Sequence, residues 1–449
     1  MPDTTSSLGI VGGGVLGMTL ALRLHGQGHR VTLIEGASAP GGLAATQQIG
    51  GYTWDRFYHV ILLSDLNLRG LLAELGLEEQ LRWGNTRTGF FTGGRLLSFS
   101  TTLDFFLFPP LSLVDKARLA GTILHASRIR DGRSLERIPV TDWLRRLSGR
   151  RTFERIWLPL LKSKLGENYR IASASFIWAI IARMYAARRS GLKREMFGYV
   201  DGGYALVLSR LRARLEAAGV EIRCGQRVNE VLSVGEGAEL VLADGSRADF
   251  DDVILTVPCG AVSRLCPTLP PAARERLDGV VYQGIICASV LLRQPLAQYY
   301  VTNITESWVP FTAVIEMTTL VDRAAFGGNA LVYLPLYLTA DDPRWQRTDA
   351  EIREAFLAAL QRMYPEFRQE DVLAFEVSRV REVLAVSTLD YTERSLPPVA
   401  SGIDHVYVVN SAQIINGTLN LNETVGLANA KAAELAPLLK RHRAAEAPA

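Results

Sequence analysis

Three glycines near the N-terminus have the spacing of a phosphate-binding loop. They are Gly12, Gly14 and Gly17, which read G-x-G-x-x-G. In such a loop the first glycine makes a tight turn, the second lets the backbone approach a pyrophosphate, and the third lets a helix pack closely on a strand. A helix that begins at Val15 and Leu16 would direct free N–H groups and a partial positive charge at the phosphates. The spacing therefore predicts a dinucleotide-binding loop.

A carboxylate follows at the distance at which it would bind a ribose. Glu35 closes a second apolar run, residues 31–34, and lies 23 positions after Gly12 (35 − 12). An acidic side chain about 20 residues after the first glycine accepts a hydrogen bond from a ribose hydroxyl. A 2′-phosphate would need an arginine instead, so Glu35 indicates an unphosphorylated ribose.

The elements that must position these residues occur in the expected order. Residues 8–11 are a short apolar run typical of a buried parallel strand, residues 15–24 are predicted to form a helix, and residues 31–34 a second buried strand. Glycines also serve in ordinary turns, so their spacing alone is a weak indication. Strand, glycine loop, helix, strand and acid together predict a Rossmann-like unit.

The next residues identify the dinucleotide. Residues 35–43 read EGASAPGGL. This stretch resembles the extended fingerprint of FAD-binding flavoproteins of the amine oxidase, protoporphyrinogen oxidase and phytoene desaturase superfamily. The resemblance implies FAD as the cofactor, with the second glycine pair close to its flavin side. It places four residues beside the cofactor: Gly36, Gly41, Gly42 and Leu43.

Two later segments extend the resemblance. Residues 198–204 (GYVDGGY) precede a predicted helix, 205–218, and a predicted strand, 220–223. In the superfamily's second FAD segment a later valine contacts the adenine through its backbone, and Val228 stands at that position. Residues 251–258 (DDVILTVP) resemble the strand that returns the chain to the sheet.

The C-terminal segment departs from the family pattern. After a predicted buried strand, residues 405–409, Asn410 and Ser411 replace the Gly-Asp of most relatives, whose carboxylate holds the ribityl-pyrophosphate region. The resemblance implies that these two side chains still bind the cofactor, with looser retention of FAD. It also places the loop 416–424 beside the flavin, with Thr424 and Val425 as cofactor contacts, before a predicted helix over 427–439.

Few residues are candidates for catalysis. His59 lies in the segment that passes near the isoalloxazine in the resembled superfamily, although a histidine satisfied by the backbone is an equal alternative. Residues 157–166 resemble a segment that lines the substrate side, so Lys162 or Lys164 could face a pocket. Lysines beside a proline are more often exposed to solvent.

Composition limits the remaining classes. At 449 residues the chain exceeds a single core, so two domains are expected. A net charge of +3 does not indicate nucleic acid. The four cysteines form no CxxC pair, and no cluster of metal ligands is seen, so no metal is expected. A polar start and the absence of about 18 consecutive apolar residues predict a cytoplasmic chain without a transmembrane helix.

One region carries an excess of positive charge. Residues 128–155 contain nine arginines against four acidic residues, and the strongly apolar run 103–111 precedes them. A solvated helical face explains most of these arginines. The alternative is an anionic or lipid-like substrate, or peripheral contact with an acidic membrane surface.

We expect an α/β fold with a discontinuous, Rossmann-like FAD-binding domain (residues 1–100, 196–270 and 390–449) and an inserted helical and α+β substrate domain (101–195 and 271–389). The expected function is that of a FAD-dependent oxidoreductase which removes a hydride from a small-molecule amine or from an apolar or anionic substrate. Two alternatives stay open. The segment around His59 also resembles UDP-galactopyranose mutase, a redox-neutral flavoenzyme, and the loss of Gly-Asp allows a non-catalytic flavin-binding protein. The oligomeric state is not predicted.

Overall fold

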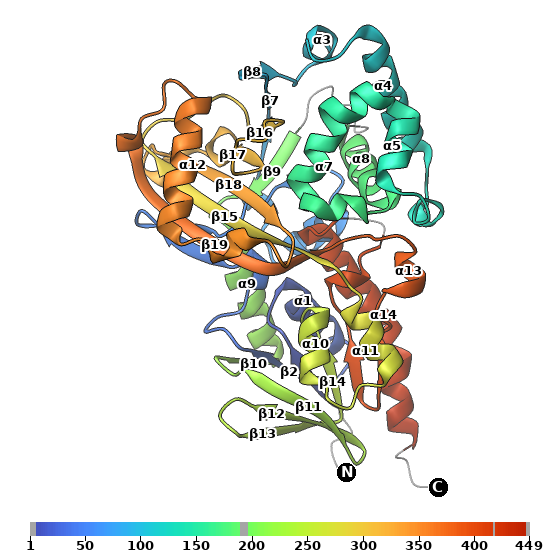
Figure 1. Ribbon diagram of the computed structural model, residues 1–449. Coiled ribbons are helices and arrows are strands. Elements are labelled where there is room, and N and C mark those ends of the chain that lie inside the picture. The colour runs from blue at the N-terminus through green and yellow to red at the C-terminus, as the bar shows by residue number, and fades with distance from the viewer. Residues whose placement is uncertain (1–5, 189–195, 416–417, 446–449) are drawn as a thin grey trace.

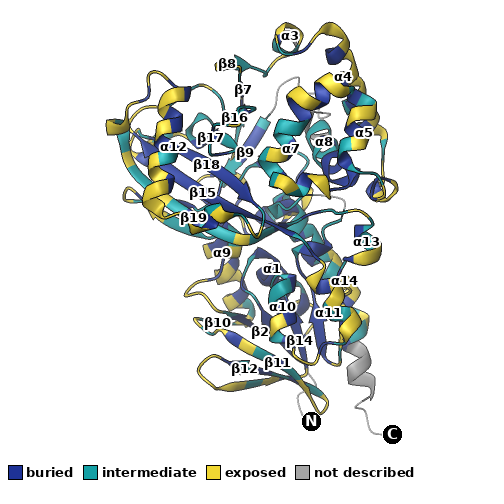
Figure 2. Ribbon diagram, viewed as in Figure 1, coloured by how far each residue is buried: buried dark blue, intermediate teal, exposed yellow. Residues whose placement is uncertain are grey.

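The computed structural model describes residues 6–188, 196–415 and 418–445. Figure 1 shows a lower body that holds a parallel sheet and both chain ends, and an upper body formed by a second sheet and a group of helices. The strands of both sheets are mostly buried, and exposed residues lie on the outer helices and turns (Figure 2). The predicted mixed α/β fold is therefore confirmed.

The lower body is built on a six-stranded sheet. Five strands run parallel, and the edge strand β20 pairs antiparallel with β21. Both faces are covered, which is why these strands read as continuous apolar runs. The strands in spatial order are β10 (Glu221–Cys224), β2 (Arg30–Glu35), β1 (Ser7–Val11), β14 (Asp252–Leu255), β21 (Val406–Val408) and β20 (Ala400–Ile403).

Helices cover one face of this sheet and a small sheet covers the other. On the first face pack α1 (Val15–His25), α2 (Leu66–Glu74), α9 (Gly203–Ala218) and α14 (Leu421–Ala445). On the second lie α10 (Cys259–Leu265), α11 (Pro271–Asp278) and the meander β11 (Val228–Val234), β12 (Gly237–Leu242) and β13 (Arg247–Phe250).

The strand order reverses between β1 and β14. From β1 the chain passes through α1 to β2 on one side, whereas β14 pairs with β1 on the other side. In open α/β sheets a ligand binds at the carboxyl ends of the strands beside such a reversal. The fold therefore places a binding crevice where Gly12 and Thr256 follow their strands.

The upper body contains a seven-stranded sheet. Its neighbours pair antiparallel except β16 and β7, which run parallel. Helix α12 (Asp349–Met363) packs on it through a separate apolar core. The strands in spatial order are β19 (Val372–Ala385), β15 (Tyr282–Leu292), β18 (Ala330–Leu338), β17 (Ala313–Glu316), β16 (Val301–Ile304), β7 (Thr88–Thr92) and β8 (Arg95–Ser98).

The hairpin of β7 and β8 belongs to the upper sheet. The hairpin itself forms as predicted, with Thr92 opposite Arg95 across the Gly93–Gly94 turn. Residues 88–98 fall within the range predicted for the FAD-binding domain, whereas β7 pairs with β16 and so extends the upper sheet. The pairing joins residues more than 200 positions apart, which no local pattern reveals.

A group of helices stands beside this sheet and forms its own core around Trp143 and Phe153. Its helices are α3 (Thr102–Leu107), α4 (Leu113–Arg128), α5 (Val140–Ser148), α6 (Arg150–Thr152), a π-helical turn (Phe153–Trp157), α7 (Leu158–Leu165) and α8 (Ala174–Arg188). This is the helical part of the predicted insertion.

Short elements join the two bodies. They are β3 (Thr46–Ile49), β4 (Tyr52–Asp55), β5 (Ile61–Leu62), β6 (Leu81–Asn85), β9 (Met196–Val200) and α13 (Tyr391–Arg394). Strand β9 pairs with both β5 and β6. In the described part of the chain, no helix has the length and apolarity needed to span a bilayer.

Candidate cofactor and substrate site

The first glycine loop has the geometry that a pyrophosphate requires. Gly12 has a φ of +113°, and a Cβ there would lie 2.5 Å from Thr256 Oγ1. A Cβ at Gly17 would overlap the carbonyl oxygen of Gly12. In front of Gly14, by contrast, a Cβ would meet nothing closer than Gly42 Cα at 3.9 Å. The loop is therefore tightly packed at Gly12 and Gly17, and it has free space at Gly14.

The open side faces unpaired backbone donors. Gly14 is the N-cap of α1, and no side chain caps the helix there. The first N–H groups of a helix lack intrahelical partners and carry partial positive charge. The side chains of Val15 and Leu16 are buried in the core, so only their backbone can reach a ligand. The residues present thus fit the phosphates of a dinucleotide.

The second glycine pair packs against the first loop. Gly41 N donates to Gly13 O at 2.8 Å, and Gly14 and Gly41 form an isolated parallel bridge. A Cβ at Gly42 would lie 3.1 Å from Gly14 Cα. The next residue, Leu43, contacts the apolar cluster of the upper body. Residues 41–43 therefore lead from the phosphate loop toward the second sheet.

Glu35 lines a cavity of about 410 Å³. Its carboxylate accepts hydrogen bonds from Gly13 N and Ala37 N, both at 2.7 Å. Gly36 and Val228 also line the cavity, and their contact with a cofactor stays a prediction. Gly36 leaves room there, because a Cβ on it would meet Arg227 only at 3.7 Å.

Sequence reasoning missed several side chains of this cavity. Gln226 lines it, and the buried Oε1 of Gln226 has no hydrogen-bond partner among the described residues. An unpaired buried acceptor is the kind of group that a bound ligand satisfies. Arg264 of α10 also lines the cavity. Gln226 lies two positions before Val228, so the predicted adenine contact could have indicated it. No local pattern indicates Arg264.

Asn410 has a structural role that its sequence position did not predict. Its side chain is buried, accepts a hydrogen bond from Ala412 N at 3.1 Å and donates to Val257 O at 3.0 Å. It thereby ties the end of β21 to the segment after β14. The amide is committed to protein partners, whereas Ser411 is half-buried beside it. Contact of either residue with the cofactor stays a prediction.

The start of the last helix differs from the expected one. Helix α14 begins at Leu421, six positions before the predicted 427, because Asn420 Oδ1 accepts from Glu423 N at 3.1 Å and begins the helix. Thr424 Oγ1 donates to Asn420 O at 2.8 Å, and Val425 is fully buried in the lower core. Only the backbone of Val425 can therefore face a cofactor. Residues 416–417 of the predicted flavin-side loop lie outside the described residues.

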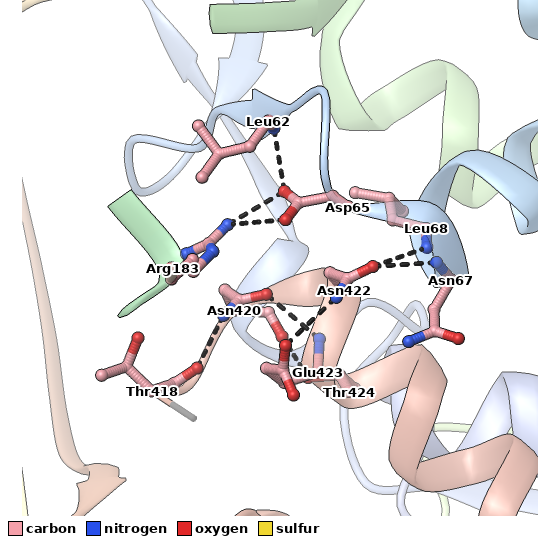
Figure 3. A network of polar contacts seen from close by, with 10 residues as sticks. All are labelled: Leu62, Asp65, Asn67, Leu68, Arg183, Thr418, Asn420, Asn422, Glu423 and Thr424. Carbon is pink, nitrogen blue, oxygen red and sulfur yellow. Dashed lines mark hydrogen bonds and ion pairs between the residues drawn. The ribbon is translucent and has the colours of Figure 1, made fainter. Parts of the chain in front are cut away.

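Asn422 connects this helix start to α2. Its Oδ1 accepts hydrogen bonds from Asn67 N at 2.9 Å and from Leu68 N at 3.2 Å (Figure 3). Both N–H groups belong to the first turn of α2, where the donors lack a partner within the helix. The N-cap residue Asp65 does not serve them, because its carboxylate binds Leu62 N and Arg183. Asn422 of α14 therefore takes the place of an N-cap side chain for α2.

Asp65 and Arg183 extend the network to α8. Arg183 Nη2 lies 2.9 Å from Asp65 Oδ2, and Asp65 is nearly fully buried. The pair joins the helical group to the loop before α2 (Figure 3). The buried Nε of Arg183 has no hydrogen-bond partner among the described residues.

His59 lies beside Asp55 and Tyr204. Its Nδ1 is 3.9 Å from Asp55 Oδ2, and its ring centroid is 4.9 Å from that of Tyr204. Burial lowers the pKa of His59 to about 4 and raises the pKa of Asp55 to about 7, although the hydrogen bond from Tyr204 N opposes the latter shift. His59 is therefore neutral at physiological pH.

Two polar atoms of this group are buried without a partner in the described chain, namely His59 Nδ1 and Tyr204 Oη. Desolvated polar groups left unpaired cost free energy, so they indicate a ligand or water at this place. Contact of His59 with the flavin stays a prediction.

Lys164, and not Lys162, points into the molecule. Lys164 Nζ lies 2.6 Å from Tyr337 Oη, which lies 2.8 Å from Tyr58 Oη. The chain of three polar groups therefore runs from α7 through β18 to the residue next to His59. Burial raises the pKa values of both tyrosines above the usual range, so both hydroxyls keep their protons. Lys162 is exposed and lies over the ring of Tyr169 at 5.8 Å.

Comparison with known proteins shows the family. The family model described as flavin containing amine oxidoreductase matches residues 17–418. A coproporphyrinogen III oxidase of Mycobacterium tuberculosis is 29% identical over 300 residues, which cover 61% of this chain. The chain spans 64% of the length of that relative.

Solved structures show the same fold. A candidate protoporphyrinogen oxidase from Exiguobacterium superposes with a TM-score of 0.75 at 20% identity, over 96% of this chain and 98% of the other. A reduced UDP-galactopyranose mutase superposes with a TM-score of 0.74 at 14% identity, over 98% and 99%. At these identities the likeness concerns the fold alone.

The predicted flavin cofactor and oxidoreductase class are those of the matched family. The match begins at Gly17, the last glycine of the first loop, and covers the second glycine pair, the helical group and the upper sheet. The chain therefore belongs to the family of flavin containing amine oxidoreductases.

Proposed function

We propose that this protein is a FAD-dependent oxidoreductase that removes a hydride from a small molecule bearing a carboxylate, held between the helical group and the upper sheet. The observation that carries the proposal is the chain from Lys164 through Tyr337 to Tyr58. It begins in the helical group and ends next to His59, in the segment that follows the second glycine pair.

FAD would lie across the lower body, with its adenosine in the cavity at Glu35, its pyrophosphate at Gly14 and its flavin toward residues 41–43. When bound, it supplies the acceptor for a hydride, which leaves a substrate C–H bond with its electron pair. The protein provides orientation and a site that excludes water. The Nδ1 of neutral His59 has no hydrogen-bond partner among the described residues and can accept a hydrogen bond from a bound molecule.

Lys164 favours an anionic substrate over an amine. Its Nζ is half-buried against Tyr337, where a carboxylate would form a charge-assisted hydrogen bond with it. A protonated amine would be repelled by the same cation. The mycobacterial relatives are named coproporphyrinogen III oxidases, and coproporphyrinogen III bears carboxylates, so it is the first substrate to test.

The experiment compares two lysines of one helix. The flavin-loaded protein is mixed with coproporphyrinogen III in the absence of oxygen, and flavin reduction is followed by absorbance. We expect Lys164→Met to lower the rate about 10- to 150-fold, which corresponds to the 1.5–3 kcal/mol of a charge-assisted hydrogen bond. Lys162→Met keeps the same chemistry on the exposed face and is expected to change the rate less than about twofold.

Equal rates in both variants would remove Lys164 from the substrate site. A flavin that carboxylate-bearing substrates never reduce, but that primary amines reduce, would overturn the proposed substrate class. Turnover of a nucleotide sugar that needs reduced flavin and consumes no acceptor would favour the mutase alternative. A bound flavin that no reductant or substrate bleaches would favour a non-catalytic role. A cytoplasmic location stays a prediction.

A further inference from the structure

A contiguous apolar surface stands at the junction of α3 and α4. It consists of Leu103, Phe106 and Leu107 of α3 and Leu113 and Val114 of α4, here named the apolar tip. Their exposed fractions are 66%, 55%, 67%, 72% and 63%. Among the described residues these are five of the eleven exposed large apolar side chains, and they fall within 12 positions (103–114). Figure 2 shows this exposed corner, and Figure 1 places it at the end of the molecule opposite both termini.

The inner side of α3 is apolar as well. Phe105 and Phe108 pack against Phe99, with ring centroids 5.8 and 5.0 Å away. Phe108 also meets Phe90 at 5.5 Å. Large exposed apolar patches on a protein surface mark interaction sites. The outer side of α3 is thus a surface made for an apolar partner.

Specific bonds hold the tip in its exposed position. Capping boxes begin both helices, at Thr101 for α3 and at Ser112 for α4. Lys116 Nζ of α4 donates to Phe106 O of α3 at 2.5 Å, and Arg155 Nη1 donates to Pro110 O in the linker between the two helices at 2.6 Å. The apolar side chains are therefore presented on an ordered support.

The segment that carries the tip has a positive net charge, which favours an anionic partner. Residues 101–170 contain 14 Lys and Arg and 7 Asp and Glu, a net +7, whereas the whole chain carries +3. The remaining residues therefore carry −4 (3 − 7). The two acidic residues of the tip helices are also engaged, since Asp104 binds Ser98 and Asp115 binds Ser112. An exposed apolar surface on a segment of net positive charge is typical of proteins that bind anionic lipid surfaces.

We propose that the apolar tip inserts into the interfacial region of an anionic lipid bilayer, with the cationic helical group against the headgroups. The lower body then faces away from the lipid, because the tip and the parallel sheet stand at opposite ends of the molecule (Figure 1). Contact of this kind is peripheral and requires no spanning helix.

The test is flotation of the flavin-loaded protein with vesicles. Vesicles of phosphatidylcholine alone are compared with vesicles that also contain phosphatidylglycerol. We expect binding to the anionic vesicles, weakened by salt, and about tenfold or more weaker binding of Leu107→Glu. The matched control is Val234→Glu, which places the same charge at another apolar residue, 56% exposed, on the β11 turn of the lower body.

Unchanged flavin content shows that each variant is folded. Failure of the wild-type protein to float with anionic vesicles at low salt would overturn the proposal. Equal loss of binding in Leu107→Glu and Val234→Glu would also do so. If light scattering instead finds a dimer that Leu107→Glu dissociates, the tip contacts a second copy and not a membrane.

Discussion

Replacement of Glu35 gives the sharpest test of the cofactor site. The Glu35 carboxylate accepts one hydrogen bond from Gly13 N and one from Ala37 N, each at 2.7 Å. An ionised carboxylate has about four acceptor positions, so about two remain for the hydroxyls of a ribose. The same side chain therefore shapes the phosphate loop and is free to bind the adenosine.

The expected magnitude follows from these bonds. Loss of a hydrogen bond to a charged acceptor costs about 1.5–3 kcal/mol, so Glu35→Ala is expected to weaken FAD binding about 10- to 150-fold. Glu35→Gln keeps the length of the side chain but places an N–H₂ group where one acceptor was. Since both acceptors face a backbone N–H, we expect the glutamine variant to lose nearly as much affinity as the alanine variant.

Affinity is measured by titration of the cofactor-free protein with FAD, followed by flavin fluorescence. Glu221→Gln is the control, because Glu221 lies on the neighbouring strand β10 and binds Arg223 at the surface. Circular dichroism verifies that each variant is folded. A dissociation constant within about twofold of the wild-type value in Glu35→Ala would refute the adenosine site at this cavity.

Three further predictions concern the loop, the helix cap and the buried acid. Gly14→Val is expected to give a folded but colourless protein. The φ of −68° at Gly14 is open to any residue, and the valine side chain would fill the free space that the pyrophosphate needs. Circular dichroism and absorbance test this, and a yellow variant contradicts it. Asn422→Ala leaves two N–H groups of α2 uncapped and is expected to cost about 1–3 kcal/mol, seen as a thermal midpoint several degrees lower; an unchanged midpoint would exclude the cap. The pKa of Asp55 is raised to about 7 from 3.8, so its protonated form favours the fold, and this stabilisation is lost as the pH rises from about 4 through 7. The thermal midpoint of Asp55→Asn, relative to that of the wild type, is therefore expected to rise between pH 5 and pH 8, and a constant difference would show that Asp55 does not titrate in this range.

The loop and its sheet were predictable because their determinants are local. Gly12, Gly14, Gly17 and Glu35 occupy one strand–helix–strand unit, in which spacing along the chain fixes position in space. The glycines are required by backbone contacts within that unit and at its edge, and such requirements are visible as residue types. The same holds for the Gly93–Gly94 hairpin.

Long-range contacts decided what the sequence left open. Lys162 and Lys164 are alike in sequence, and only the position of Tyr337, 173 residues later, distinguishes them. The pairing of β7 with β16 and the capping of α2 by Asn422 also join distant segments.

The residue types of the chain thus determined the cofactor loop, the family and most of the elements. The tertiary structure alone decided which of the two lysines contacts Tyr337, that Asn410 bonds to its own backbone neighbours, and that Leu103, Phe106 and Leu107 of the apolar run stay exposed. The physical reason is that a side chain's partner and its exposure depend on what packs against it, and those neighbours come from other parts of the chain.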